Sequence, residues 1–238
     1  MAVRAITFDF WNTLFRDANG PPRQQMRIDA FAKATGVETA RIDDVLNHVW
    51  AEFARTHKEE QRTLGPRDAV RLAAQALNAT IAPDVEDELT DLFATAILAY
   101  SPVLIEGADQ AVRVAAEFGP IAIISDSGVS PGSSLRELLV RANLAQYFTT
   151  MVFSDEVGVA KPQTPMFATA AQGLDVTMSD LLHIGDLEHT DIAGAKAVNA
   201  QAAIFGNGEP TGETRADYVI THWHEFSDIV NQLSGQAA

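Results

Sequence analysis

The feature that most constrains the fold is a series of short apolar runs separated by segments of helical length. The first run, residues 3–10, is apolar at most positions, as expected of a strand that is covered on both faces. Further strands are predicted over residues 120–125, 150–154, 181–185, 201–205 and 217–220. This alternation predicts an α/β fold with a doubly wound parallel sheet and helices on its faces.

The long interval between the first two predicted strands has a different character. Residues 16–101 contain no convincing strand pattern but four helical ones, over residues 23–35, 40–58, 66–78 and 84–100. Glycine and proline separate these helices. We therefore predict an α/β core made of residues 1–15 and 102–238, with an all-helical domain of residues 16–101 inserted into it.

Composition excludes several classes of function. The chain has 238 residues, 47% of them hydrophobic, which suffices for a large buried core. Its net charge of −15 argues against nucleic acid and anionic membranes as partners, and the lack of cysteine removes thiol chemistry. Because Arg4 and Asp9 interrupt the N-terminal apolar run, no signal peptide or membrane span is predicted there. We expect a soluble, cytoplasmic protein.

Polar residues follow the predicted strands at the points where a functional site would form. Asp9 and Ser125 end the first two strands, and Lys161 lies in the loop after residues 150–154. Asp186 and Asp191 follow the strand at residues 181–185. Since ligands of doubly wound sheets bind beyond the carboxyl ends of the strands, these side chains are predicted to share one site.

The residue types favour metal-assisted phosphoryl transfer. A carboxylate such as Asp9 can attack phosphorus, but a hard cation must screen the two anions, and Mg²⁺ takes carboxylate and carbonyl ligands. Asp9, Asp186 and Asp191 are the candidate metal ligands. A lysine such as Lys161 adds charge neutralisation, and a hydroxyl such as that of Ser125 can donate to a phosphoryl oxygen.

Four motifs resemble the haloacid dehalogenase superfamily, and together they cover most of the chain. They are "FDFWNTL" on the first strand, "IISDSG" on the second, "GVAKPQTPMF" around the lysine and "HIGDLEHTDIAGAKAVN" with the acidic pair. Family proteins of this layout have a Rossmann-like core and carry a helical cap between the first two motifs. The resemblance therefore implies that residues 16–101 form such a cap.

The resemblance also implies roles for individual residues. The implied catalytic residues are Asp9 as nucleophile, Ser125 and Lys161. The implied phosphate-binding residues are Asn12, Ser125, Asp126 and Lys161, where Asn12 and Asp126 replace a more familiar glycine and asparagine. The implied metal ligands for Mg²⁺ are Asp9, Asp186, Asp191 and the main-chain carbonyl of Trp11. The histidines His183 and His189 are interpreted as a packed core residue and a loop residue, outside the site.

Trp11 departs from the family pattern and leaves the reaction open. Family phosphatases usually carry a second aspartate at this position, which protonates the leaving group, and a tryptophan cannot do so. We predict Mg²⁺-dependent hydrolysis of a small phosphorylated metabolite through an aspartyl-phosphate.

Two alternatives to that reaction stay open. The first is haloacid or phosphonate hydrolysis within the superfamily. Family dehalogenases need no metal and lack the acidic pair, and phosphonate hydrolysis would require Lys33 or Lys58 as a Schiff-base lysine. The second is a binding or regulatory protein with weak turnover, which Trp11 alone supports.

Overall fold

The computed structural model describes residues 2–209 and 211–236, and its centre is a six-stranded sheet in the order β5-β4-β1-β6-β7-β8. All neighbouring strands in it are parallel. The strands are β1 Ala5–Phe8, β4 Ile121–Ser125, β5 Thr150–Phe153, β6 Leu181–Gly185, β7 Gln201–Phe205 and β8 Tyr218–Ile220. The predicted α/β fold is confirmed, and each predicted strand is present.

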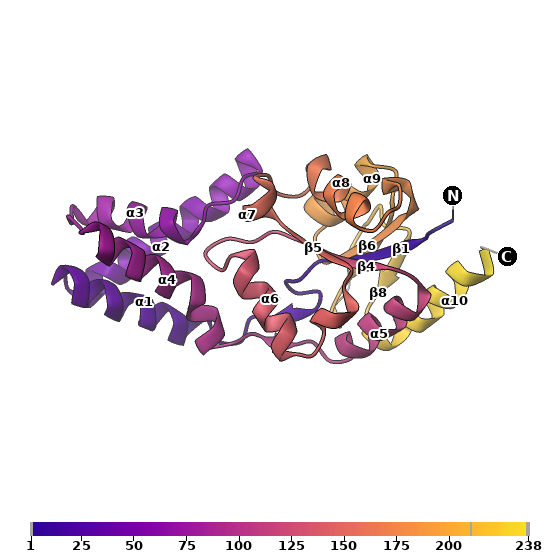
Figure 1. Ribbon diagram of the computed structural model, residues 1–238, viewed down its shortest axis with the longest axis horizontal. Coiled ribbons are helices and arrows are strands. Elements are labelled where there is room, and N and C mark those ends of the chain that lie inside the picture. The colour runs from indigo at the N-terminus through magenta and orange to yellow at the C-terminus, as the bar shows by residue number, and fades with distance from the viewer. Residues whose placement is uncertain (1, 210, 237–238) are drawn as a thin grey trace.

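Helices cover both faces of the sheet (Figure 1). One face packs against α5 Ala108–Phe118, α6 Gly132–Arg141 and α10 Phe226–Gln236, and the other against α8 Thr164–Gly173 and α9 Ala193–Ala197. Alternate side chains of a strand point to opposite faces, so Ile6 joins the first core and Ala5 the second. The shorter helices are α7 Ser154–Val157, η2 Ala145–Tyr147, η3 Met178–Asp180, η4 Glu188–Ile192 and η5 Trp223–Glu225.

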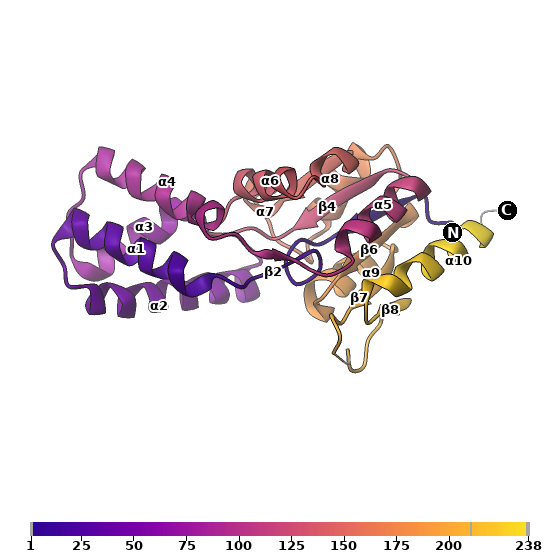
Figure 2. The same cartoon turned by 90° about the horizontal axis from the view of Figure 1, so that it is seen from below.

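A separate group of helices lies beside the sheet (Figures 1 and 2). Its members are α1 Gly20–Thr35, α2 Thr39–Arg55, η1 Thr56–Glu60, α3 Pro66–Leu77 and α4 Pro83–Ala99, called the helical segment below. They share a hydrophobic core of their own, in which Phe31, Leu46 and Phe93 are fully buried. All four predicted helices are present, although the second ends at Arg55 and is followed by the π-helical turn η1 from Thr56.

Two short strands join the helical segment to the rest of the chain. β2 Phe15–Arg16 and β3 Val103–Leu104 pair antiparallel at the points where the chain leaves for the helical segment and returns from it (Figure 2). The amide of Ile105 donates to the carbonyl of Leu14 at 2.8 Å beside this pair. The sequence did not predict them, because a two-residue strand is too short to show a period.

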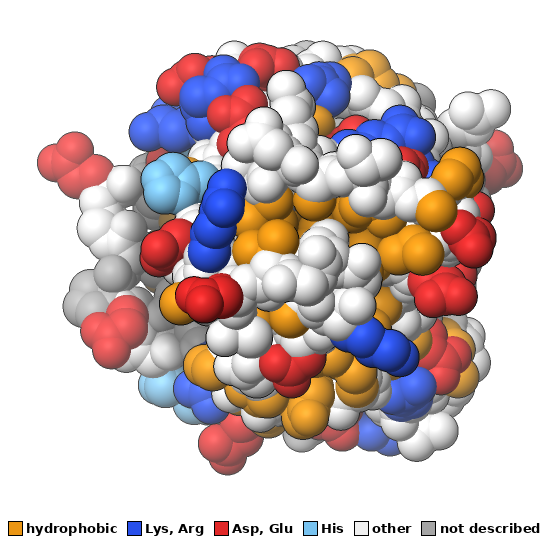
Figure 3. Space-filling model, turned by 90° about the vertical axis from the view of Figure 1, so that its left-hand side faces the viewer, with side chains coloured by type: hydrophobic (Ala, Val, Ile, Leu, Met, Phe, Trp, Pro, Cys, Tyr) orange, Lys and Arg blue, Asp and Glu red, His pale blue; other side chains and the backbone are white. Residues whose placement is uncertain are grey.

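The free end of the helical segment presents hydrophobic side chains among charged ones (Figure 3). A groove between α1 and α4 is lined in part by Met26, Ala30, Val85 and Leu92. Within the described part of the chain, no helix combines the length and the apolar character needed to cross a membrane.

Candidate active site

The carboxyl ends of three adjacent strands bring the predicted residues to one edge of the sheet. β1 lies between β4 and β6. Asp9 follows β1, Ser125 ends β4 and Asp186 follows β6. The amide of Asp9 donates to the carbonyl of Ile184 at 2.8 Å, which continues the ladder between β1 and β6 past the end of β1. This pairing fixes the backbone of Asp9 against the loop that carries Asp186.

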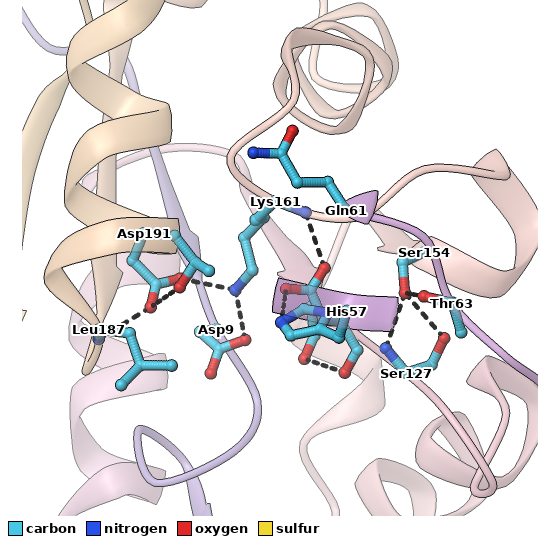
Figure 4. Close-up of polar contacts among 12 residues, drawn as sticks. Asp9, His57, Gln61, Thr63, Ser127, Ser154, Lys161, Leu187 and Asp191 are labelled. Atoms are coloured by element: carbon cyan, nitrogen blue, oxygen red, sulfur yellow. Dashed lines mark hydrogen bonds and ion pairs between the residues drawn. The ribbon is translucent and has the colours of Figure 1, made fainter. Parts of the chain in front are cut away.

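Lys161 lies at the centre of the site (Figure 4). Its ammonium donates to one oxygen of Asp9 and one of Asp191, each at 2.6 Å, and its side chain is only 2% exposed. The backbone amide of Lys161 donates to Oδ1 of Asp126 at 2.8 Å, which ties the lysine loop to the loop after β4. A buried cation is therefore held between two of the predicted carboxylates.

Asp191 is the most firmly held of the carboxylates. Besides Lys161, the amide of Leu187 and the ring of His183 donate to it, both at 3.0 Å, and the Thr190 hydroxyl donates at 3.4 Å. Burial lowers the pKa of His183, so the ring is neutral at neutral pH, and the other ring nitrogen is 2.9 Å from the Thr7 hydroxyl. In the tautomer that suits both contacts, Nε2–H donates to Asp191 and Nδ1 accepts from Thr7.

His183 corrects one interpretation of the sequence. The residue is buried, as expected of a packed core side chain, but it also contacts a residue of the site. A histidine inside an otherwise apolar strand is the sequence signal for such a role, because a buried polar ring needs partners. His189 is exposed in η4 and lines a cavity together with Lys161.

The carboxylates of the site differ in their affinity for protons. Burial, together with the charges of Asp191 and Asp186, raises the pKa of Asp9 to about 7, although Lys161 opposes the rise. Burial and Asp191 likewise raise the pKa of Asp186 to about 6. For Asp191, burial is outweighed by Lys161 and His183, which hold its pKa well below its ordinary value. Asp191 and Lys161 thus stay charged, while Asp9 and Asp186 titrate near neutrality.

The donor set fits a hard divalent cation. Oxygen atoms of Asp9, Asp186 and Asp191 all lie within 4.8 Å of one another. One lysine does not neutralise three carboxylates, and the neighbouring carboxylates add to the effect of burial in raising the pKa values of Asp9 and Asp186. Carboxylate oxygens alone, with no sulfur or imidazole among these three residues, suit Mg²⁺.

Ser125 and Asp126, two further predicted residues, lie around this cluster and make no hydrogen bond to the Lys161 ammonium among the described contacts. The Ser125 hydroxyl is fully buried and its contact is the Asp126 carbonyl, at 3.4 Å. The second oxygen of Asp126 lies 3.6 Å from Nε2 of His57, on the helical segment. Neither the approach of His57 to Asp126 nor the hydrogen bond from the Lys161 amide to Asp126 was predictable from the sequence, because both depend on how distant segments pack.

Trp11 and Asn12 form part of the wall of a cavity beside the cluster. Asn12 has a left-handed backbone with φ of 53°, a conformation that asparagine tolerates better than most residues and in which it can replace a glycine. The half-buried Trp11 ring packs edge-on against Phe10, with centroids 5.1 Å apart. The cavity has a volume of about 570 Å³. Its wall is completed by Asp17, Gly20, Pro21, Arg23, Gln24, Arg27, Asn47, Trp50, Ile97, Val129 and Ser130.

Comparison with known families identifies the chain. A family model described as haloacid dehalogenase-like hydrolase matches residues 3–199. The chain belongs to this family. The resemblance inferred from the four sequence motifs is thereby confirmed for this haloacid dehalogenase-like hydrolase.

One relative of this hydrolase is named as a phosphatase. A glyceraldehyde 3-phosphate phosphatase of Methanopyrus kandleri is 30% identical over 104 residues, which are 41% of this chain and 45% of the relative. The chain thus spans less than half the length of that relative.

Two solved structures share the fold over nearly the whole hydrolase. The 2-haloacid dehalogenase of Pseudomonas syringae pv. Tomato DC3000 has a TM-score of 0.70 at 21% identity and covers 99% of this chain and 100% of its own. The putative hydrolase YfnB of Bacillus subtilis bound to magnesium has a TM-score of 0.65 at 16% identity, covering 97% and 100%. At sequence identities of 21% and 16%, this similarity shows that the fold is shared, and it carries no statement about activity.

Proposed function

We propose that this hydrolase cleaves a small phosphorylated metabolite in a Mg²⁺-dependent reaction with Asp9 as the nucleophile. The observation that carries the proposal is the convergence of Asp9, Asp186 and Asp191 within 4.8 Å beside Lys161. A site that only displaces halide has no use for two further carboxylates, because they repel the nucleophile. The phosphatase name of one relative and the bound magnesium of another support the same reaction.

In the proposed reaction Asp9 attacks phosphorus and the alcohol leaves, which gives an aspartyl-phosphate that water then hydrolyses. Lys161, buried against Asp9, neutralises charge on the phosphoryl group. Asn12, Ser125 and Asp126 line the phosphate site in this proposal. Mg²⁺, held by the three aspartates and the Trp11 carbonyl, would screen the charge between nucleophile and phosphate.

The domain boundaries predicted at residues 15/16 and 101/102 belong to the same proposal. With them, the helical segment acts as a cap, and its side chains at the cavity beside Trp11 select the substrate. A cytoplasmic location also stays a prediction, which fractionation of expressing cells would test.

Phosphonate hydrolysis is a second candidate, favoured by the position of Lys58. This lysine lines a cavity of about 420 Å³ together with Lys161, whereas Lys33 lines the outer groove between α1 and α4. Of the two lysines considered from the sequence, Lys58 is thus the one that could form a Schiff base with a carbonyl-bearing phosphonate. Borohydride trapping of such an adduct, lost in Lys58→Met, would support this reaction over ester hydrolysis.

The deciding experiment is a hydrolysis screen with Mg²⁺ and with excess chelator. The panel contains phosphate monoesters, acyl phosphates, phosphonates and 2-haloacids. We expect phosphate release from monoesters or acyl phosphates, restored by Mg²⁺ after chelation. Full activity in chelator, or halide release alone, would contradict the proposal.

Magnesium affinity is expected to fall as the pH is lowered. Bound Mg²⁺ needs ionised carboxylates, and the pKa values of Asp9 and Asp186 are raised to about 7 and about 6 in the metal-free protein. Metal binding must displace a proton from Asp9 below pH 7 and from Asp186 near pH 6, so the dissociation constant is expected to rise about 20-fold from pH 8 to pH 6. Titration calorimetry at the two pH values measures this, and equal affinities would contradict a metal site that includes Asp9.

Trp11→Asp is expected to change the preference for leaving groups. Alkoxide leaving groups need protonation, and a general acid contributes about 10²–10⁴ in rate, whereas aryl groups depart without one. We expect the alkyl-to-aryl ratio of kcat/KM to rise in the variant, even though loss of the contact with Phe10 lowers stability. The ratio corrects for partial unfolding, which lowers both rates together. An unchanged ratio in folded protein would mean that position 11 does not address the leaving group.

A further inference from the structure

Arg27 of α1 is a buried arginine whose Nε lacks a polar partner among the described residues. Its side chain is only 6% exposed, and its Nε has no hydrogen-bond partner in the described part of the chain, where the residue also forms no ion pair. The guanidinium carbon lies 5.3 Å from the ring centroid of Trp50 and 5.6 Å from that of Phe93. These aromatic faces attract the positive charge but accept none of the N–H groups in the plane of the guanidinium.

The surroundings of Arg27 are positively charged. The neighbouring Arg23 already has polar partners, because it forms an ion pair with Asp17 and donates to the Tyr100 carbonyl at 2.8 Å. Two arginines and one aspartate in the same cavity wall leave one positive charge uncompensated. Burial and repulsion from Arg23 lower the pKa of Arg27 to about 10, so it is charged at neutral pH. The excess of positive charge in this cavity wall contrasts with the net charge of −15 of the whole chain.

The cavity that Arg27 lines also reaches the candidate active site. Trp11 and Asn12, in its wall, lie two and three residues after Asp9 in the chain, and Ser130 belongs to the loop after β4. With a volume of about 570 Å³, the cavity has room for a small metabolite. Arg27 belongs to α1 of the helical segment, whereas Trp11, Asn12 and Ser130 belong to loops after β1 and β4, so the cavity is lined by both parts of the chain. A substrate whose phosphate is bound near β1 would extend its remote part toward the helical segment.

We propose that Arg27 binds a carboxylate of the substrate, so that the substrate is a small phosphate monoester that also carries a carboxylate. This inference rests on the proposed hydrolase function. One unpaired guanidinium matches one monoanion, and its planar pair of N–H groups fits a carboxylate in a bidentate contact. A second phosphate group, with up to two charges, would leave a buried negative charge uncompensated.

Binding of phosphonates that cannot be hydrolysed tests the inference without turnover. Carboxyalkyl phosphonates of two to four carbons are compared by calorimetry with their carboxamides and with alkyl bisphosphonates, in the presence of Mg²⁺. The wild type is expected to bind the best carboxylate about 10- to 100-fold more tightly than its carboxamide. Arg27→Met is expected to lose this difference, and Arg27→Lys to keep part of it. Arg41→Met, at an exposed position of α2, is the matched control and is expected to keep all of it.

Each other outcome overturns the inference. A wild type without preference for the carboxylate, a preference that survives in Arg27→Met, or tighter binding of a bisphosphonate would each exclude the proposed contact. The wild-type comparison decides even if Arg27→Met does not fold.

Hydrolysis assays separate this inference from the proposed function. Monoester hydrolysis without carboxylate preference contradicts the inference alone, and carboxylate-selective binding without hydrolysis of any monoester contradicts the function alone.

Discussion

Asp9→Asn is expected to abolish phosphate release and to leave the fold intact. The substitution keeps the shape of the side chain and an oxygen that can accept from Lys161, but it removes the nucleophilic charge. Loss of a nucleophile commonly costs about 10⁴-fold or more in kcat, so the variant should fall to the background rate. Steady-state phosphate release measures the loss, and circular dichroism compares the fold with that of the wild type.

A trapping experiment locates the nucleophile independently of rate. Fluoroberyllate mimics a phosphoryl group on a carboxylate and is expected to bind the wild type and not Asp9→Asn. Asp228→Asn, the same change at an exposed position of α10, serves as the control and should be inhibited like the wild type. Trapping that persists in Asp9→Asn would place the nucleophile at another carboxylate.

Lys161→Met is expected to lower the free energy of unfolding by about 3–5 kcal/mol, because breaking a buried ion pair leaves a charge uncompensated. The ammonium lies 2.6 Å from oxygens of both Asp9 and Asp191, all buried, so the variant leaves two carboxylates facing one another. Urea denaturation at pH 8 in chelator measures the effect. Lys33→Met, at an exposed position of α1, is the control and should change stability little.

The pH dependence of this loss has a definite sign. Without the lysine, Asp9 and Asp191 raise one another's pKa above the value in the unfolded chain, so the folded variant binds more protons than the unfolded one. Its stability relative to the wild type should therefore recover as the pH falls from 8 to 5.5. A destabilisation that is constant across this range, or as small as that of Lys33→Met, would show that Lys161 does not compensate these charges.

The sheet could be predicted because its strands are covered on both faces. Predominantly apolar runs such as residues 181–185 and 201–205 coincide with β6 and β7 to the residue. The convergence of Asp9, Asp186 and Lys161 was also predictable, since parallel strands place their carboxyl ends on one edge. Both inferences need only the order of residues along the chain and a general rule of topology.

Contacts between distant side chains could not be predicted in this way. The hydrogen bond between His183 and Asp191 depends on the turn η4, which carries Asp191. The hydrogen bond from the amide of Lys161 to the side chain of Asp126 joins two loops. Arg27 lies on an amphipathic helix, where charged residues are usually solvated, and its burial results from packing against Trp50 and Phe93 of other helices. The spacing of apolar residues in a sequence predicts which face of a helix is buried, but it does not predict which other element packs against that face.

The strand order has a consequence for how the chain emerges from the ribosome. β1 is synthesised first, yet both of its partners come much later, since β4 begins at Ile121 and β6 at Leu181. Until β4 is synthesised, about halfway along the chain, this apolar strand has no partner on either edge. By contrast, α1–α4 pack against helices close to them in sequence and can fold early. Unpaired strand edges promote aggregation, so the nascent chain stays vulnerable until β6 has left the exit tunnel. Demand for chaperones is then set by the synthesis of residues beyond 185 and not by the folding of the helices.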